Sequence, residues 1–183
     1  MNIYLVTGNL NKVKEVEAIL GHPIKNVDLK LDEIQELDPK KIAQHKVLQA
    51  WEKTQEPIFV LDQSLYIDCL NGFPGPLIHW FWTTIGLEKT CEIAASYNNH
   101  KISTETLLAY YDGAKVEYFS GICAGTIPES PRGDQGWGWD PIFIPEGFDL
   151  TYGEMEPVEA TKIRSYRIAV EKFREFLKSN HSV

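Results

Sequence analysis

The sequence has few cysteines, no long apolar run and no excess of positive charge. Its three cysteines are odd in number and show no metal or redox spacing, so they predict reduced thiols in a cytoplasmic protein. No apolar run approaches the roughly 20 residues that span a bilayer, and residues 1–7 are too short for a signal peptide, so we expect no membrane partner. A net charge of −8 argues against general binding of DNA or RNA, because no positive field attracts a polyanion.

The residues that are present suit a single folded domain. With 43% apolar content the chain can bury a full core, so we expect residues 1–183 to form one domain with room for two lobes. Near the N-terminus, apolar runs alternate with amphipathic stretches, and this β-α-β-α-β order predicts an α/β sheet. The predicted strands cover residues 3–7, 27–31, 57–62, 103–111 and 115–127, the last two joined by a turn at Asp112-Gly113. The predicted helices cover residues 11–20, 39–53, 77–85, 87–96 and 157–178.

The turn after the first predicted strand is a candidate anion site. Thr7, Gly8 and Asn9 precede a helix whose N-terminal N–H groups and positive dipole end favour an anion such as a phosphate chain, and Lys12 adds a full charge. The turn lacks the spacing of a Walker loop. A capping turn with a solvated lysine is the alternative, and this signal alone favours that alternative.

Two acidic stretches are candidate metal ligands. Asp62 ends the third predicted strand, and the carboxyl ends of strands in α/β sheets face the ligand crevice. Glu33 and Glu36 follow the second strand, so they could approach Asp62 and hold a magnesium ion against phosphate oxygens. An exposed acid at a strand end and a solvated acidic loop are the alternatives, and spacing alone favours the solvated loop for the two glutamates.

A glycine-spaced pair of tryptophans is the most specific single motif. In Gly136-Trp137-Gly138-Trp139-Asp140, two aromatic faces on a mobile backbone suit a flat ring such as a nucleobase. The alternative is that both tryptophans simply pack in the core. Lys162, Arg164 and Arg167, near the start of the last helix, could reach phosphates or base carbonyls, or could form a basic helix surface. A ring-binding motif together with a phosphate-binding turn indicates a nucleotide ligand.

Four blocks of sequence, in order and at compatible spacing, resemble the inosine triphosphate pyrophosphatase family. Together they extend over nearly the whole chain, which is far more specific than any one block. The blocks are Val6-Thr7-Gly8-Asn9-Leu10-Asn11-Lys12; Asp62 with Leu70-Asn71-Gly72-Phe73-Pro74-Gly75-Pro76; Pro131-Arg132-Gly133 with Gly136-Trp137-Gly138-Trp139-Asp140-Pro141-Ile142-Phe143; and Gly147-Phe148-Asp149 with Thr151-Tyr152 and Glu154-Met155.

The resemblance implies a long, twisted, mixed β-sheet flanked by helices in two lobes, with a central active-site cleft, and a homodimer. It also implies magnesium-dependent hydrolysis of the bond between the α and β phosphates of a nucleoside triphosphate, with release of a nucleoside monophosphate and pyrophosphate. The implied substrates are the non-canonical purine nucleotides ITP, dITP and XTP. The implied role is the removal of damaged precursors from the nucleotide pool.

The resemblance also carries the family's functional residues onto matching positions. Asp62 and Lys12 would be catalytic, Glu33 and Asp62 would bind the metal, and Trp137 would stack on the base. The remaining substrate contacts would come from Thr7, Gly8, Asn9, Asn11, Gln63, Gly138, Trp139, Asp140, Lys162, Tyr166 and Arg167.

Three positions depart from the family pattern. Leu61 stands where the family usually has the first of two adjacent acids, and Tyr166 replaces the histidine of a Ser-His-Arg motif. Lys162 is one residue out of register with the family's phosphate-binding lysine. The changes fall on site positions while the framework blocks persist, which leaves two alternatives open: the same fold with an altered base preference, or a nucleotide-binding module with little catalysis.

Overall fold

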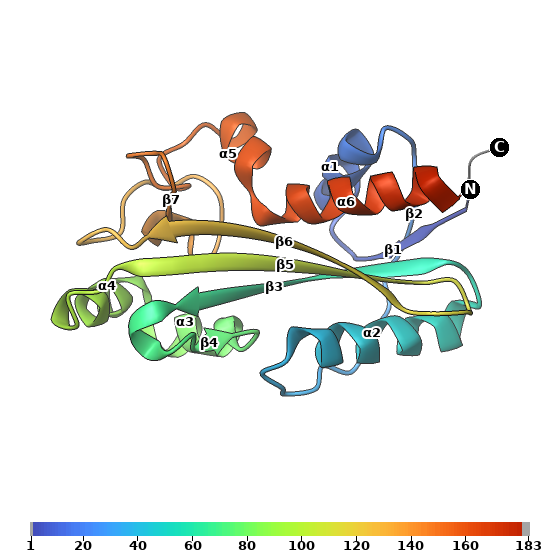
Figure 1. The fold of residues 1–183 in the computed structure, drawn as a ribbon, viewed down its shortest axis with the longest axis horizontal. Coiled ribbons are helices and arrows are strands. Elements are labelled where there is room, and N and C mark those ends of the chain that lie inside the picture. The colour runs from blue at the N-terminus through green and yellow to red at the C-terminus, as the bar shows by residue number, and fades with distance from the viewer. Residues whose placement is uncertain (1, 181–183) are drawn as a thin grey trace. The chain divides into compact units, whose positions relative to one another are not determined.

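The computed structural model describes residues 2–180, without the side chain of Asn11 (Figure 1). Its strands are β1 (Tyr4–Val6), β2 (Lys25–Val27), β3 (Ile58–Ile67), β4 (Pro74–Gly75), β5 (Lys101–Tyr111), β6 (Glu117–Thr126) and β7 (Ile144–Pro145). Its helices are α1 (Leu10–Leu20), α2 (Pro39–Thr54), α3 (Ile78–Ile85), α4 (Leu87–Ser96), α5 (Pro157–Ile163) and α6 (Ser165–Asn180). Two 3-10 turns lie among them, η1 (Asp68–Leu70) and η2 (Asp140–Ile142).

The strands form one mixed sheet. Their order is β2-β1-β3-β5-β6-β7, and β4 pairs with β3. β1 runs parallel to β2 and to β3, whereas β4 runs antiparallel to β3 and β7 runs antiparallel to β6. The predicted α/β fold with a mixed sheet is therefore confirmed.

The chain divides into two compact units. The first unit comprises Met1–Gln63, Thr106–Gly121 and Tyr166–Val183, and the second comprises Ser64–Glu105 and Ile122–Ser165. The strands β3, β5 and β6 each contribute residues to both units.

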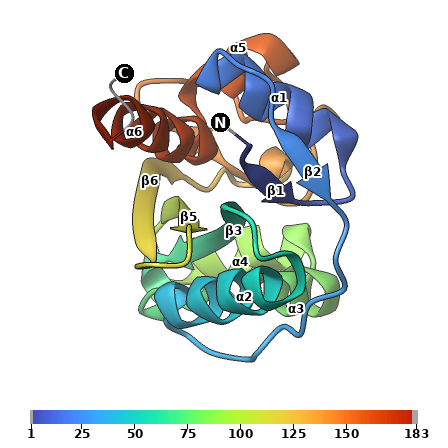
Figure 2. The same ribbon diagram turned by 90° about the vertical axis from the view of Figure 1, so that its right-hand side faces the viewer.

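The first unit has an apolar layer on each face of its strands. α1 and α6 cover one face and α2 covers the other (Figure 2). Because side chains alternate along a strand, Phe59 and Leu61 of β3 pack with α1 and α6, whereas Ile58 and Val60 pack with α2. The side chain of Asp62 follows the parity of Val60, so it is directed toward the α2 face.

The helix α2 begins with the signals expected of a helix start. Asp38 is its N-cap, because the Asp38 Oδ1 accepts a hydrogen bond from Lys40 N at 2.9 Å, and Pro39 occupies the first helical position. Ala43, Val47 and other small apolar side chains bury one stripe of the helix against β3 and β5. Lys46 lies one position before Val47 and reaches the edge of that stripe.

The second unit has a single apolar core. It gathers Leu65 and Ile67 of β3 with side chains from α3, α4, α5, η2 and the loops between them. Phe143 and Tyr152 stack at its centre, with ring centroids 5.0 Å apart and 4° between their planes.

The strand β3 continues past the end that the apolar run predicted. It extends to Ile67 rather than ending at Asp62, because Leu65 pairs with Gly75 of β4 and Leu65 and Ile67 are buried. Asp62 therefore lies in the middle of a strand. The prediction that Asp62 ends a strand was wrong, and strand parity instead sets the face toward which its side chain points.

The second strand and the hairpin turn also differ from prediction. β2 covers Lys25–Val27 rather than residues 27–31, because β1 offers three residues for pairing and each is already matched, from Tyr4 with Lys25 to Val6 with Val27. Leu29 and Leu31 lie outside the strands and pack against the apolar side chains that α2 buries on the sheet. The connection between β5 and β6 spans residues 112–116 rather than a two-residue turn.

The last predicted helix is two helices. The backbone of Arg164 is extended, with φ −71° and ψ 148°, and it separates α5 from α6. The apolar periodicity of residues 157–178 continues across this break, so the sequence pattern does not reveal it.

Candidate active site

The turn between β1 and α1 combines a capped helix start with a half-buried lysine. Asn9 Oδ1 accepts a hydrogen bond from Lys12 N at 3.2 Å, and Thr7 Oγ1 accepts one from Asn9 N at 3.0 Å. A Cβ at Gly8 would press against the carboxylate of Asp28, so glycine allows this close approach. The side chain of Asn11, a predicted substrate contact, lies outside the described residues.

The Lys12 side chain turns toward β3 rather than into solvent. Its Nζ donates a hydrogen bond to the carbonyl oxygen of Leu61 at 3.4 Å. Burial lowers the pKa of Lys12, while Asp62 opposes this shift and Lys46 adds to it. The capping turn expected from the sequence is therefore present, but the lysine is not the solvated one of that alternative.

Lys46 of α2 joins the two predicted metal ligands. Its Nζ lies 2.6 Å from Asp62 Oδ1 and 2.8 Å from Glu33 Oε1. The Lys46 and Asp62 side chains are mostly buried, whereas the Glu33 side chain is 70% exposed. Burial by itself would lower the pKa of Lys46, but the contacts with Asp62 and Glu33 outweigh it and raise the pKa. Lys46 is therefore a fixed positive charge at neutral pH.

The two carboxylate oxygens of Asp62 differ in their contacts. Lys46 holds Oδ1, whereas Oδ2 is buried and has no hydrogen-bond partner among the described residues. A buried carboxylate oxygen without a partner is costly, so a cation or a water molecule at Oδ2 would relieve that cost.

The donor set fits a magnesium ion shared with a substrate. Within residues 2–180, no group of three His, Cys, Asp or Glu side chains could hold a metal ion by itself. Proteins commonly hold Mg²⁺ through one or two carboxylates together with substrate phosphates, and Asp62 Oδ2 and the exposed Glu33 carboxylate match that demand.

The neighbours of Asp62 on β3, Leu61 and Gln63, make structural contacts in the first unit. Leu61 belongs to the apolar cluster with α1 and α6, on the strand face opposite Asp62. An acidic side chain at position 61 would therefore point toward α1, where the surroundings in this chain are apolar. Gln63 Nε2 donates to Thr106 Oγ1 at 3.4 Å, which places it within the sheet of the first unit.

The tryptophan motif forms an exposed aromatic surface in the second unit. Trp137 is 51% exposed, whereas Trp139 is 6% exposed and joins the core. Their rings meet edge to face, with centroids 5.0 Å apart. Gly136 and Gly138 have positive φ angles of 79° and 61°, a backbone conformation that glycine adopts without strain. The motif thus has one solvent-exposed ring, that of Trp137, and one ring buried in the core, that of Trp139.

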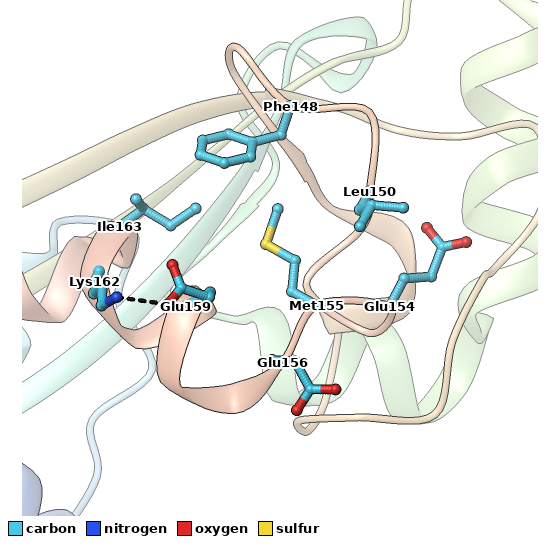
Figure 3. A pocket seen from close by; sticks show the side chains of 8 residues that line it. All are labelled: Phe148, Leu150, Glu154, Met155, Glu156, Glu159, Lys162 and Ile163. Carbon is cyan, nitrogen blue, oxygen red and sulfur yellow. Dashed lines mark hydrogen bonds and ion pairs between the residues drawn. The ribbon is translucent and has the colours of Figure 1, made fainter.

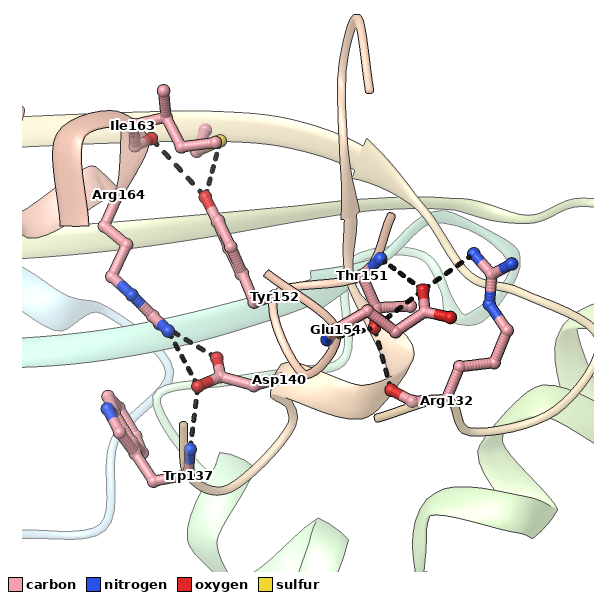
Figure 4. Close-up of polar contacts among 9 residues, drawn as sticks. Arg132, Trp137, Asp140, Thr151, Tyr152, Glu154, Ile163 and Arg164 are labelled. Atoms are coloured by element: carbon pink, nitrogen blue, oxygen red, sulfur yellow. Dashed lines mark hydrogen bonds and ion pairs between the residues drawn. The ribbon is translucent and has the colours of Figure 1, made fainter. Parts of the chain in front are cut away.

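Asp140 is an internal anchor of this loop. Its carboxylate is fully buried and accepts two hydrogen bonds from Arg164, Oδ1 from Nη1 at 2.9 Å and Oδ2 from Nη2 at 2.8 Å (Figure 4). Oδ2 also accepts the backbone N–H of Trp137 at 2.7 Å. A Cβ at Gly136 would clash with this oxygen. Asp140 therefore holds the loop backbone through its charge.

The remaining predicted contacts are spread over α5 and α6. Lys162 pairs with Glu159 and lines a cavity of about 380 Å³, whose walls are apolar and acidic (Figure 3). Those walls do not suit a triphosphate. Arg167 pairs with Glu171 one turn further along α6, at 2.9 Å. Tyr166 is 8% exposed and belongs to the apolar cluster of α1 and α6.

The sequence gives no indication of Lys46, whereas it marks Arg164 as a candidate contact for phosphates or base carbonyls but does not predict its partner. Lys46 lies in the middle of a predicted helix with no motif around it, and only the packing of α2 on β3 brings it to Asp62. Arg164 was grouped with two other basic residues, and its pairing with Asp140 depends on the helix break. No sequence signal marks either contact.

Comparison with known proteins gives one consistent result. Residues 3–176 match the profile of the Ham1 family. The chain is 36% identical to the dITP/XTP pyrophosphatase of Methanopyrus kandleri, over 98% of each chain, and 39% identical to the inosine triphosphate pyrophosphatase of Candida glabrata, over 96% of each. The structure of the Staphylococcus aureus Ham1 protein superposes with a TM-score of 0.87 at 19% identity, covering 98% of this chain and 100% of that one, so it shows a shared fold.

Within the part of the chain that the structure describes, no helix is long and apolar enough to cross a membrane. The match over nearly the whole length and the identity to curated relatives agree with the four sequence blocks. The chain belongs to the Ham1 family, which is the inosine triphosphate pyrophosphatase family that its motifs resemble.

Proposed function

We propose that the protein is a magnesium-dependent nucleoside triphosphate pyrophosphatase that acts on ITP, dITP and XTP. Its relatives at 36% and 39% identity carry the names dITP/XTP pyrophosphatase and inosine triphosphate pyrophosphatase. The observation that carries the proposal is the Asp62 carboxylate, which has one oxygen held by Lys46 and the other buried without a described partner. Removing such nucleotides from the pool would be its role in the cell.

The groups of the first unit divide the work of phosphate binding. Lys12 and the positive end of α1 would bind phosphate oxygens, and Lys46 would add a second charge while it fixes the orientation of Asp62. Asp62 Oδ2 and Glu33 would hold Mg²⁺, which when bound neutralises phosphate charge. Water would attack the α-phosphorus, the bond to the bridging oxygen of the β-phosphate would break, and pyrophosphate would leave.

The groups of the second unit would recognise the base. Trp137 is half exposed beside a buried Trp139, so its face is available for stacking on a purine ring. Asp140 would act on the base pocket through the loop backbone, because its carboxylate is fully buried and is bonded to Arg164 and Trp137 N.

A panel of nucleotides tests the proposal. The protein would be incubated with Mg²⁺ and ITP, dITP, XTP, ATP, GTP, CTP or UTP, and phosphate measured with and without added inorganic pyrophosphatase. We expect phosphate only when that enzyme is added, the highest rates with ITP, dITP and XTP, and no reaction in EDTA. Direct release of orthophosphate, or no turnover of any nucleotide, would contradict the proposal.

One observation favours a second candidate, the same chemistry on a different base. Tyr166 occupies the position of the family's histidine, and it packs in the apolar cluster of α1 and α6. Without that histidine, groups other than the side chain at position 166 would select the base. A nucleotide outside the inosine and xanthosine series that gives the highest kcat/KM in the panel would favour this candidate.

The homodimer is part of the proposal. Trp80 of α3 is 58% exposed and Phe73 is 44% exposed, so the second unit carries exposed aromatic side chains that a second copy could cover. Light scattering after size-exclusion chromatography should give twice the 20.9 kDa mass of one chain, and a monomer mass would contradict this part.

A further inference from the structure

Arg164 is held at the point where the last helical segment breaks. Its extended backbone lets the side chain leave the helix direction and reach Asp140, which lies 24 residues earlier in the chain. The side chain is 12% exposed. A buried guanidinium at a helix break is costly unless its neighbours compensate the charge, so its partners are informative.

Asp140 and Tyr152 both contact the Arg164 guanidinium. Asp140 accepts from both terminal nitrogens, a paired geometry that only arginine can make. The guanidinium also lies over the ring of Tyr152, 4.4 Å from its centroid. Tyr152 is itself anchored, because its ring stacks on Phe143 and its hydroxyl lies 3.2 Å from Cys123 Sγ.

Asp140 connects Arg164 to Trp137 through hydrogen bonds. The same Oδ2 that accepts from Arg164 accepts the Trp137 backbone N–H, so the carboxylate connects the helix break to the exposed tryptophan (Figure 4). Gly136 and Gly138 flank Trp137, and the freedom of glycine places few steric restraints on the backbone there. Trp137 O also accepts a hydrogen bond from Asp140 N at 3.2 Å and the Trp137 ring meets Trp139, so the hydrogen bond from Trp137 N is one of the restraints that set where the indole ring lies.

We propose that Arg164 is a positioning residue for base recognition, acting through Asp140 on the backbone of Trp137 rather than on the substrate. The inference rests on the proposed function in one respect, that Trp137 stacks on the base. It separates the task of Arg164 from that of the phosphate-binding lysines, because every contact that carries it lies within the second unit.

The test compares Arg164→Met and Arg164→Lys with Arg132→Met. Arg132 is the matched control, since it is an arginine of the same unit that pairs with Glu154 and with the Asp149 carbonyl rather than with Asp140. Arg164→Lys keeps a charge over Tyr152 but cannot make the paired hydrogen bonds, so it serves as the test if Arg164→Met does not fold. Each variant is also made in a Trp137→Ala background.

Three measurements separate positioning from other roles. We expect Arg164→Met to raise the KM for ITP by roughly 5- to 50-fold, part of the loss from removing a base-stacking ring, with a much smaller change in kcat. Inhibition by inorganic tripolyphosphate, which has no base, should be unchanged. In the Trp137→Ala background the same substitution should have little further effect, because the path from Arg164 to the base is already cut.

Each contrary outcome overturns the inference. Multiplied effects of Arg164→Met and Trp137→Ala would mean that Arg164 contacts the substrate itself. A lower melting temperature with an unchanged KM would mean that Arg164 only stabilises the fold. Arg132→Met should leave the KM unchanged, and an equal rise in that control would show a general effect of losing an arginine.

A readout without nucleotide keeps this test apart from the proposed function. The difference in tryptophan emission between each protein and its Trp137→Phe partner reports the surroundings of the Trp137 ring. Arg164→Met should change that difference and Arg132→Met should not. If the wild-type protein releases no pyrophosphate, the proposed function fails, whereas an unchanged Trp137 emission in Arg164→Met would refute the positioning role on its own.

Discussion

Asp62→Asn is the substitution that most directly tests the charge cluster of the first unit. The asparagine keeps the size of the side chain but removes its charge. Lys46 then loses a partner at 2.6 Å and keeps the exposed Glu33, and Lys12 loses the carboxylate that opposes its lowered pKa. A metal ion bound at Oδ2 would lose a negatively charged ligand, and a water bound there would lose a charged hydrogen-bond acceptor.

Asp62→Asn should lower both the stability of the protein and its turnover rate, by different amounts. A hydrogen bond between charged groups contributes about 1.5–3 kcal/mol, and the partial exposure of Asp62 favours the lower part of that range. We therefore expect a loss of about 1–2 kcal/mol in the free energy of unfolding, and a melting temperature lower by roughly 2–8 °C. Loss of a catalytic acid or base typically costs about 10²- to 10⁴-fold in rate, so turnover should fall far more than stability.

The assay for Asp62→Asn is pyrophosphate release from ITP at saturating Mg²⁺, with thermal unfolding measured on the same samples. Asp32→Asn is the matched control, because it removes the same charge from an exposed side chain that contacts Gln49 instead of Lys46. The alkaline limb of kcat/KM should also move to lower pH in Asp62→Asn, since the carboxylate that raises the pKa of Lys12 is gone. Turnover of Asp62→Asn equal to that of Asp32→Asn would remove Asp62 from the mechanism.

Three further outcomes are expected. The pKa of Lys46 is raised above its ordinary value of 10.5 in the folded state, so protonated Lys46 stabilises the fold fully below pH 10.5 and stops doing so as the pH rises through the folded-state pKa. The free energy of unfolding in urea should therefore be higher for wild type than for Lys46→Met below pH 10.5, and this difference should disappear only above the folded-state pKa. Gly136→Ala should cost about 1–3 kcal/mol in unfolding free energy, measured with denaturant, because position 136 has a positive φ and its Cβ would clash with Asp140; stability equal to wild type would contradict the clash. Tyr166→His should lower the melting temperature but leave the ranking of nucleotides in the pyrophosphate assay unaltered, since Tyr166 packs in an apolar cluster, and a changed ranking would show that position 166 contacts the base.

The sequence by itself determined the fold class, the family and most of the elements. Hydrophobic periodicity is a local property, so α1, α2, α3 and α4 appear within two residues of their predicted bounds. Ordered motifs along the chain were enough for the family, because they do not depend on contacts. The Thr7–Lys12 turn and the tryptophan motif were recognisable for the same reason.

Only the tertiary structure decided which charges meet. Parity along an unexpectedly long β3 turned Asp62 toward α2, and that packing brought Lys46 against it. The break between α5 and α6 lets Arg164 reach a carboxylate 24 residues away, and no helical pattern encodes that contact. A contact between residues distant in sequence is set by the packing of whole elements, and for that reason the site's electrostatics followed from the fold and could not be predicted from the motifs.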